Sequence, residues 1–283
     1  MSQLSGKTYL VAGGGTGIGL AVVQQLIDQG ATVRVVSRSM SDALSALGVD
    51  HYVWDATSDD LPNDAIPEVL HGLVYAPGTI NLKPFQALKL DTFREDWEIN
   101  VGGAIKLLQA CWRSLKKAEG ASVVLYSTVA VEVGMNYHAS VAAAKGALEG
   151  LGRSLAAEWA RSQIRVNLIA PSLTDTPLAE NLLSTDDKRE ASAQRHPLGR
   201  VGTPEDMANA TLWLLMPQSN WVTGQVLAQA FAASRNKYGT ACSCSDWMAL
   251  QRSSAEYLFR MRPPNGSLDS ERGPRAPSGY PRM

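Results

Sequence analysis

Short apolar runs alternate with helical patterns along the first 228 residues of the chain. Five of these runs predict strands, because nearly continuous apolar residues are typical of strands that helices cover on both faces of a parallel sheet. The runs are Thr8–Ala12, Thr32–Val36, Leu73–Tyr75, Ser122–Tyr126 and Arg165–Ala170. A further strand, the third of the domain, is expected to end near Val53, so these runs are the first, second, fourth, fifth and sixth strands. Between the first two, Ile18, Val22 and Leu26 recur at helical spacing, and Gly30 is placed to end that helix.

Longer helical patterns follow the later strands. They predict helices over roughly Asp91–Lys117, His138–Arg161 and Pro204–Leu215. Strands and helices therefore alternate, which predicts an α/β fold of the Rossmann type: a doubly wound parallel sheet with helices on both faces. Residues 1–228 are expected to form one domain, which closes with a turn and a last strand inside Trp221–Leu227.

The chain changes character near Ala228. Residues 229–283 carry little periodic apolar surface, and their end is rich in Pro, Arg, Ser and Gly. Such a segment buries too little apolar surface to offset the entropy of ordering, so we expect a disordered tail. Its 8 Lys or Arg against 4 Asp or Glu leave open a second interpretation, a basic arm for an acidic partner or RNA.

The bulk composition fits a soluble domain of enzyme size. A chain of 283 residues with 45% hydrophobic positions can bury one large core. The formal net charge of −1 gives no general attraction to nucleic acid or membrane, and no apolar run approaches the roughly 20 residues that cross a bilayer. The N-terminus lacks the apolar segment of a secretory signal, and three cysteines, an odd number, favour a reducing cytoplasm. Cys242 and Cys244 have no ligand cluster nearby, so no metal site is expected.

A glycine-rich loop follows the first predicted strand and precedes the first helix. It runs Gly13-Gly-Gly-Thr-Gly17-Ile18-Gly19. Glycines let the backbone approach a pyrophosphate closely, and the start of a helix offers free N–H groups and the positive end of its dipole. The loop therefore predicts a dinucleotide site; the alternative is a turn that only packs helix on strand.

The chain resembles the short-chain dehydrogenase/reductase family over residues 1–228, beginning with the spacing Gly13-x-x-x-Gly17-x-Gly19. In that family a helix carries Tyr-x-x-x-Lys, in which the tyrosine gives a proton to a carbonyl and the lysine lowers the tyrosine's pKa. Here Lys145 is present and Val141 stands at the tyrosine position, so the usual proton donor is missing. The family's Asp-Gly-Gly near its last strand is also missing. We therefore hypothesise that residues 229–283 are an out-of-frame extension, which resequencing of the gene would test.

The resemblance implies a set of cofactor contacts beyond the loop. NAD-preferring members place an acidic residue after the second strand, where this chain has Ser37 and Arg38. These donors suit the 2′-phosphate of NADP, so NADP is expected and NAD is the alternative. The remaining expected contacts are Ile18 and Gly19, Asp55 at adenine, Ala76 and Gly78 in the turn after the fourth strand, Lys145 at the nicotinamide ribose, and Pro171 and Thr176 near the carboxamide.

The resemblance also implies the groups around a substrate. Asn100 corresponds to the family asparagine that holds a water in the proton relay, together with Lys145. Ser127 and Thr128 end the fifth strand where the family has Ser-Ser, and Thr128 lies 13 residues before Val141, the family's usual separation of serine and tyrosine. Thr128 can still donate a hydrogen bond to a substrate oxygen, and Ser127 is a neighbour of the same kind.

His138 is a candidate replacement for the missing proton donor. It precedes Lys145 by seven residues and shares its helix face. Its reference pKa of about 6.5 suits proton transfer at neutral pH. The alternative is a surface or end-capping histidine at the start of the helix.

Together these features imply an NADP-dependent oxidoreductase that transfers a hydride between NADP(H) and a small alcohol or carbonyl compound. The competing interpretation is a catalytically impaired relative that binds NADP as a sensor or structural protein. The family resemblance also implies a homodimer, and the composition favours the cytoplasm, with no nucleic-acid or membrane partner.

Overall fold

The computed structural model describes residues 3–58 and 61–230 of the 283. Contacts divide the chain into two units, Met1–Ser234 and Arg235–Met283, and the second unit lies outside the described residues. The expected disordered tail, residues 229–283, therefore falls outside the described part except at Gln229 and Ala230.

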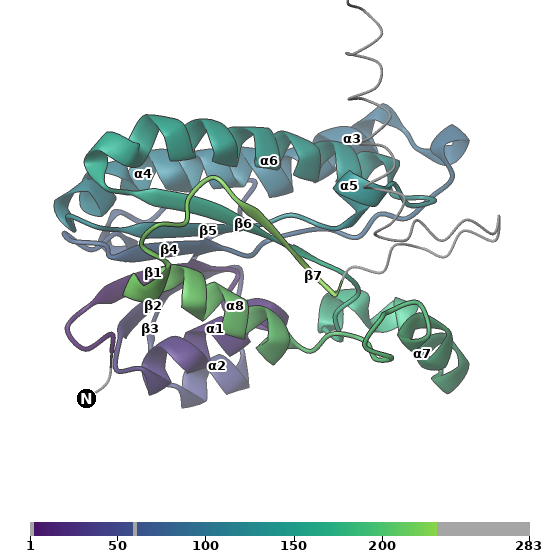
Figure 1. The fold of residues 1–283 in the computed structure, drawn as a ribbon, viewed down its shortest axis with the longest axis horizontal. Coiled ribbons are helices and arrows are strands. Elements are labelled where there is room, and N and C mark those ends of the chain that lie inside the picture. The colour runs from purple at the N-terminus through teal and green to yellow at the C-terminus, as the bar shows by residue number, and fades with distance from the viewer. Residues whose placement is uncertain (1–2, 59–60, 231–283) are drawn as a thin grey trace, which may run out of the picture. The chain divides into compact units, whose positions relative to one another are not determined.

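A seven-stranded parallel sheet forms the centre of the first unit, in the order β3-β2-β1-β4-β5-β6-β7 (Figure 1). The strand order reverses between β1 and β4, which makes that point the switch point of a doubly wound sheet. The predicted Rossmann-type fold is confirmed. The strands are β1 Thr8–Ala12, β2 Thr32–Ser37, β3 Asp50–Val53, β4 Gly72–Tyr75, β5 Ser122–Tyr126, β6 Arg165–Pro171 and β7 Val226–Gln229.

Helices cover both faces of this sheet (Figure 1). One layer contains α1 Gly17–Asp28, α2 Asp42–Ala46 and α8 Pro204–Leu215; the other contains α3 Leu90–Trp97, α4 Gly103–Lys117, α5 Ala130–Val133 and α6 Ala139–Trp159. Alternate residues of each strand point to opposite faces. In β1, Tyr9 and Val11 join the core beneath α1 and α8, while Leu10 and Ala12 join the core beneath α4 and α6.

The predicted helices appear with small changes of bounds. The pattern over Asp91–Lys117 contains α3, a π-helical segment Glu98–Gly102 and then α4. The pattern over His138–Arg161 contains α6 and a short 3-10 turn, Ala160–Ser162. The pattern over Pro204–Leu215 matches α8. Short elements carried no prediction: α2, α5, α7 Asp186–Ala193, and 3-10 turns at Asn63–Ala65, Phe85–Ala87, Pro177–Leu182 and Pro217–Ser219. In the described part of the chain, no helix has the length and hydropathy needed to cross a membrane.

Candidate active site

The glycine-rich loop is a close-packed turn between β1 and α1. Gly13 and Gly17 have φ angles of +76° and +52°, which glycine adopts without strain. A Cβ at Gly13 would lie 3.1 Å from the Pro77 nitrogen, and one at Gly19 would overlap the carbonyl oxygen of Gly13. The loop therefore has a cradle shape that only glycine allows, and such a shape fits the diphosphate of a nicotinamide dinucleotide.

Two other predicted cofactor segments meet this loop. A Cβ at Gly17 would lie 3.3 Å from the Thr176 Cβ, so the segment after β6 contacts the start of α1. The turn after β4 is held to β1 by a hydrogen bond from the Ala76 N–H to the Ala12 carbonyl, 3.0 Å. The carbonyl of Pro171 accepts from the Val129 N–H at 3.1 Å and ties the ends of β5 and β6 together. The fold thus brings distant predicted segments to the carboxyl edge of the sheet.

The segment after β2 closes one side of the loop. Ser41 Oγ donates to the Gly15 carbonyl at 2.7 Å. Arg38 is exposed, and a Cβ at Gly15 would lie 3.4 Å from Ser37 Oγ. Hydrogen bonds from Thr57 lower the pKa of the Asp55 carboxyl, and the charge of Arg38 adds to this effect. Ser37, Arg38 and Asp55 therefore lie at one corner beside the glycine-rich loop, and their predicted contacts with a cofactor stay predictions.

His51 also reaches this corner, although no motif in the sequence pointed to it. Its Nε2 lies 2.9 Å from Ser37 Oγ, whose proton goes to the Ser39 carbonyl at 3.0 Å. A hydroxyl has one proton, so Ser37 accepts from His51. Only the pairing of β2 with β3 brings the two residues together, because they are distant from one another in sequence.

Lys145, Asn100 and Gly78 form the inner end of the site. A Cβ at Gly78 would lie 3.5 Å from both Asn100 Oδ1 and Lys145 Nζ. Lys145 Nζ donates to the Tyr126 carbonyl at 2.6 Å. Burial lowers the pKa of Lys145 to about 7, although the charge of Asp96 acts in the opposite direction. Val141 lies in α6 one turn before Lys145, with 6% of its surface exposed.

The two hydroxyls at the end of β5 have different surroundings. Ser127 is buried, and its Oγ donates to Glu149 Oε1 at 2.7 Å. Glu149 also pairs with Arg153 at 2.9 Å, so the Ser127 hydroxyl is committed to α6. Thr128 is half-buried, and its Oγ1 accepts from the Ala130 N–H at 3.3 Å. That contact uses a lone pair of Thr128 and not its proton, which suits a donor to a substrate oxygen.

His138 occupies the N-cap position of α6. Its Nδ1 lies 2.7 Å from the carbonyl oxygen of Asn136, at an exposed position. The structure thus places it two helical turns from Lys145, and its predicted role as a proton donor stays a prediction.

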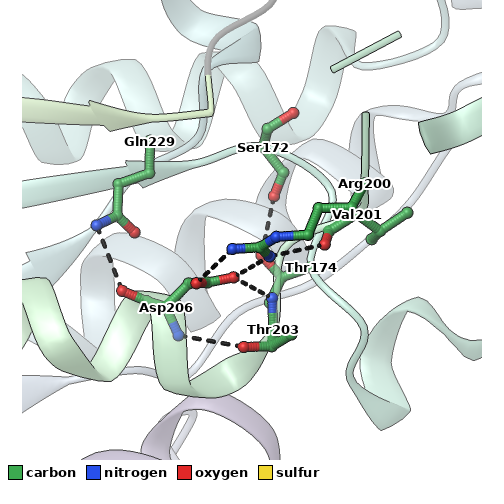
Figure 2. Close-up of polar contacts among 7 residues, drawn as sticks. All are labelled: Ser172, Thr174, Arg200, Val201, Thr203, Asp206 and Gln229. Carbon is green, nitrogen blue, oxygen red and sulfur yellow. Dashed lines mark hydrogen bonds and ion pairs between the residues drawn. The ribbon is translucent and has the colours of Figure 1, made fainter. Parts of the chain in front are cut away.

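A second polar network supports the segment that carries Thr176 (Figure 2). Arg200 holds Asp206 through two hydrogen bonds, of 2.5 and 2.8 Å, and thereby lowers the pKa of that carboxyl to about 2. Thr203 and Asp206 form a capping box at the start of α8. Beside them, Thr174 pairs with Gly202 in an isolated parallel bridge. These contacts hold the segment after β6, whose Thr176 lies against Gly17 of the glycine-rich loop.

One further group of polar residues escaped the sequence analysis. Asp96 in α3 is fully buried and accepts hydrogen bonds from Thr79 and Asn81. In the sequence it follows Glu95 within a helical pattern and resembles a solvent-facing carboxylate. In the part of the chain that the structure describes, no three His, Cys, Asp or Glu side chains gather as a metal site would require.

Comparisons with known proteins agree with this arrangement. Residues 12–229 match a family model described as enoyl-(acyl carrier protein) reductase. A tropinone reductase homologue of Arabidopsis thaliana is 36% identical over 241 residues, which cover 80% of this chain and 91% of that protein. A 2,5-dichloro-2,5-cyclohexadiene-1,4-diol dehydrogenase of Sphingobium indicum is 31% identical, with 81% and 97% covered. A short-chain type dehydrogenase/reductase of Mycobacterium ulcerans superposes with a TM-score of 0.74 at 29% identity, covering 80% of this chain and 89% of that one.

The chain belongs to the short-chain dehydrogenase/reductase family. Its relatives are dehydrogenases and reductases, so the chain is an oxidoreductase by family. Members of this family typically bind a nicotinamide cofactor, which agrees with the glycine cradle. The matched range of this short-chain dehydrogenase/reductase ends at residue 229, close to the change of composition near Ala228.

Proposed function

We propose that the protein is an NADP(H)-dependent oxidoreductase acting on a small alcohol or carbonyl compound. One observation carries this proposal: the glycine-rich loop lies against Thr176 and Pro77, while Ser37 and the exposed Arg38 belong to the segment after β2 that closes its other side. The guanidinium of Arg38 is the kind of charged donor that suits a 2′-phosphate. No acidic side chain follows β2 directly, where NAD-preferring relatives have one.

Each part of the site has a distinct task in this proposal. The start of α1 binds the diphosphate through its free N–H groups, and Arg38 binds the 2′-phosphate. Lys145 and Asn100 hold the inner end beside Gly78. The bound NADP(H) would supply or accept the hydride. Thr128 donates a hydrogen bond to the substrate oxygen and orients it.

Val141 supports a second candidate function, binding of NADP(H) without turnover. Its side chain is aliphatic and buried at the tyrosine position of the family motif. Loss of a positioned general acid typically lowers a rate by about 10²–10⁴-fold. Measured rates therefore distinguish the two candidate functions. An enzyme that uses Thr128, Lys145 or His138 would turn over slowly, whereas a protein that only binds NADP(H) would show no turnover.

Cofactor choice is tested by titrating NADPH and NADH into the protein and following tryptophan fluorescence. We expect tighter binding of NADPH, and we expect Arg38→Ser to weaken it about tenfold while NADH binding stays unchanged. Arg161→Ser is the matched control, because Arg161 is an exposed arginine just before the opposite, amino end of β6. Tighter binding of NADH would contradict NADP preference, and failure of both nucleotides to bind would contradict the cofactor site itself.

Turnover is tested by absorbance at the NADPH band with a panel of aldehydes, ketones and quinones. We expect slow reduction by the unmodified chain and an increase of about 10²-fold or more in Val141→Tyr, because a phenol restores the general acid. Ala143→Tyr, two residues further along α6 at an exposed position, should leave the rate unchanged. Equal rates for both variants would show that position 141 does not limit the reaction.

We also propose that the protein is a homodimer, as the family resemblance implies, and that it is cytoplasmic, as its composition favours. Leu151 and Leu155 are only half-buried on α6 and supply apolar surface for a partner. Light scattering coupled to gel filtration tests the dimer, and a mass equal to one chain would contradict it.

A further inference from the structure

Asp96 is a buried carboxyl group that the proposed function does not use. It lies on α3, which packs against α6, and none of its surface is exposed. Its Oδ1 accepts from Thr79 Oγ1 at 2.5 Å and from Asn81 Nδ2 at 2.7 Å, while Oδ2 has no partner within the described residues. Burial of a charged group is costly unless other groups compensate for it, so this position requires an explanation.

The directions of the hydrogen bonds connect Asp96 to Asn100. Thr79 gives its one hydroxyl proton to Asp96 Oδ1, so its oxygen accepts from Asn100 Nδ2 at 3.0 Å. The second amide proton of Asn100 goes to the Asp96 carbonyl at 2.7 Å. Both donors of the amide are thus used, and the orientation of Asn100 is fixed. Its Oδ1 is the atom left for the active site; it is buried and has no partner in the described part of the chain.

That oxygen and the Lys145 ammonium border the same residue, Gly78. Asn100 Oδ1 and Lys145 Nζ are each 3.5 Å from the position of a Cβ on Gly78. The groups that face the ammonium come from three elements: the Tyr126 carbonyl of β5, the Asn100 amide of the π-helical segment and the charge of Asp96 on α3. Asp96 raises the pKa of Lys145 against the larger effect of burial. Asp96 therefore acts on Asn100 by fixing the orientation of its amide, and on Lys145 through its negative charge.

We propose that Asp96 is a positioning residue of the active site, which fixes the Asn100 amide and favours the ammonium form of Lys145. The catalytic meaning of this role rests on the proposed function. With Val141 in place of tyrosine, the ammonium of Lys145 supplies the positive charge at the inner end of the site. Asp96 then sets the pH range over which that charge is present.

The test follows the Lys145 titration by NMR in protein labelled with ¹³C at lysine Cε, without cofactor. The resonance is assigned with Lys145→Arg. We expect Asp96→Asn to lower the pH midpoint of Lys145 by about half to one unit, because a nearby anion favours the charged form of an amine. That shift is equivalent to a change of about 3- to 10-fold in the ratio of ammonium to amine at fixed pH.

Asp91→Asn is the matched control, since Asp91 is on the same helix but is exposed and pairs with Arg94. It should leave the Lys145 midpoint unchanged. An unchanged midpoint in Asp96→Asn, with the fold intact, would overturn the proposal. If Asp96→Asn does not fold, the unmodified protein gives the same information: the ¹³Cγ resonance of Asp96 should show a step at the Lys145 midpoint. Absence of that step would overturn the proposal equally.

Turnover separates the inference from the proposed function. In a turning-over enzyme, Asp96→Asn should move the alkaline limb of the kcat profile for carbonyl reduction to lower pH, with KM changed less than twofold. Thr79→Val keeps the charge but removes the link to Asn100, so it should lower kcat without moving the Lys145 midpoint. A chain that binds no nucleotide would defeat the proposed function, yet the NMR midpoints would still decide whether Asp96 controls Lys145.

Discussion

At the scale of single residues, two positions of α6 distinguish this chain: Lys145, whose pKa is lowered, and Val141, which occupies the tyrosine position one turn earlier. Lys145 is buried, and its ammonium has the Tyr126 carbonyl as a close acceptor. Burial disfavours the charged form of an amine, which explains a pKa near 7. The chain therefore keeps an ionisable group whose charge changes in the neutral range.

This burial makes the stability of the fold depend on pH. The unfolded chain holds the Lys145 proton up to about pH 10, whereas the folded chain releases it above about 7. Because the unfolded state binds more protons between these values, the free energy of unfolding rises with pH through this window. Below about pH 7 both states are charged and the cost of burial is present in full.

We expect Lys145→Met to remove this dependence. The variant's free energy of unfolding, relative to the unmodified chain, should fall by roughly 2–3 kcal/mol between pH 7 and 9. Urea denaturation at the two pH values measures the difference. Lys117→Met, at an exposed lysine, is the control and should show no such change. A difference that is constant with pH would mean that Lys145 stays charged in the folded protein.

At the scale of elements, the π-helical segment Glu98–Gly102 separates α3 from α4. The sequence predicts one continuous helix from Asp91 to Lys117, but the structure widens it by one turn between α3 and α4. This turn carries Asn100, and such insertions are frequent at functional sites. The widened turn therefore helps to place the Asn100 amide at Gly78, which Lys145 also borders.

The start of α8 offers a test of local stabilisation. Thr203 Oγ1 accepts from the Asp206 N–H at 3.3 Å, and Asp206 Oδ2 accepts from the Thr203 N–H at 2.8 Å (Figure 2). We expect Thr203→Ala to lower the free energy of unfolding by about 1 kcal/mol, because one N–H of the first turn loses its acceptor. Thr203→Ser keeps the oxygen and should lose less than half of that. Equal losses in the two variants, measured by urea denaturation, would show that the methyl group matters instead.

At the scale of the whole molecule, the doubly wound sheet collects the site. The loops after β1, β2, β4, β5 and β6 lie at the carboxyl edge of parallel strands, next to the switch point between β1 and β4. Ligands of open α/β sheets bind at this place. Residues separated by more than a hundred positions, such as Gly17 and Thr176, are in contact there.

The family match and the last described strand both end at residue 229, which predicts the outcome of a truncation. A variant that ends at Ala230 keeps every described strand and both cores, so we expect it to fold and bind NADPH as the full chain does. Its free energy of unfolding should differ by less than about 0.5 kcal/mol, because the removed segment has little apolar surface to bury. Loss of folding or binding in the truncated variant would show that residues 231–283 contribute to the domain.

The sequence by itself determined the strands, the principal helices and the glycine loop, because each depends on a local pattern: apolar period, glycine spacing or a terminating glycine. It also identified Ser37, Arg38 and Lys145 as candidate cofactor contacts, because each stands at a fixed distance from a recognisable motif or strand. Only the tertiary structure decided that Ser127 binds Glu149, that His51 reaches Ser37 and that Asp96 is buried behind Asn100. These contacts join residues through strand pairing and helix packing, and the geometry of such pairing is absent from any local pattern of side chains.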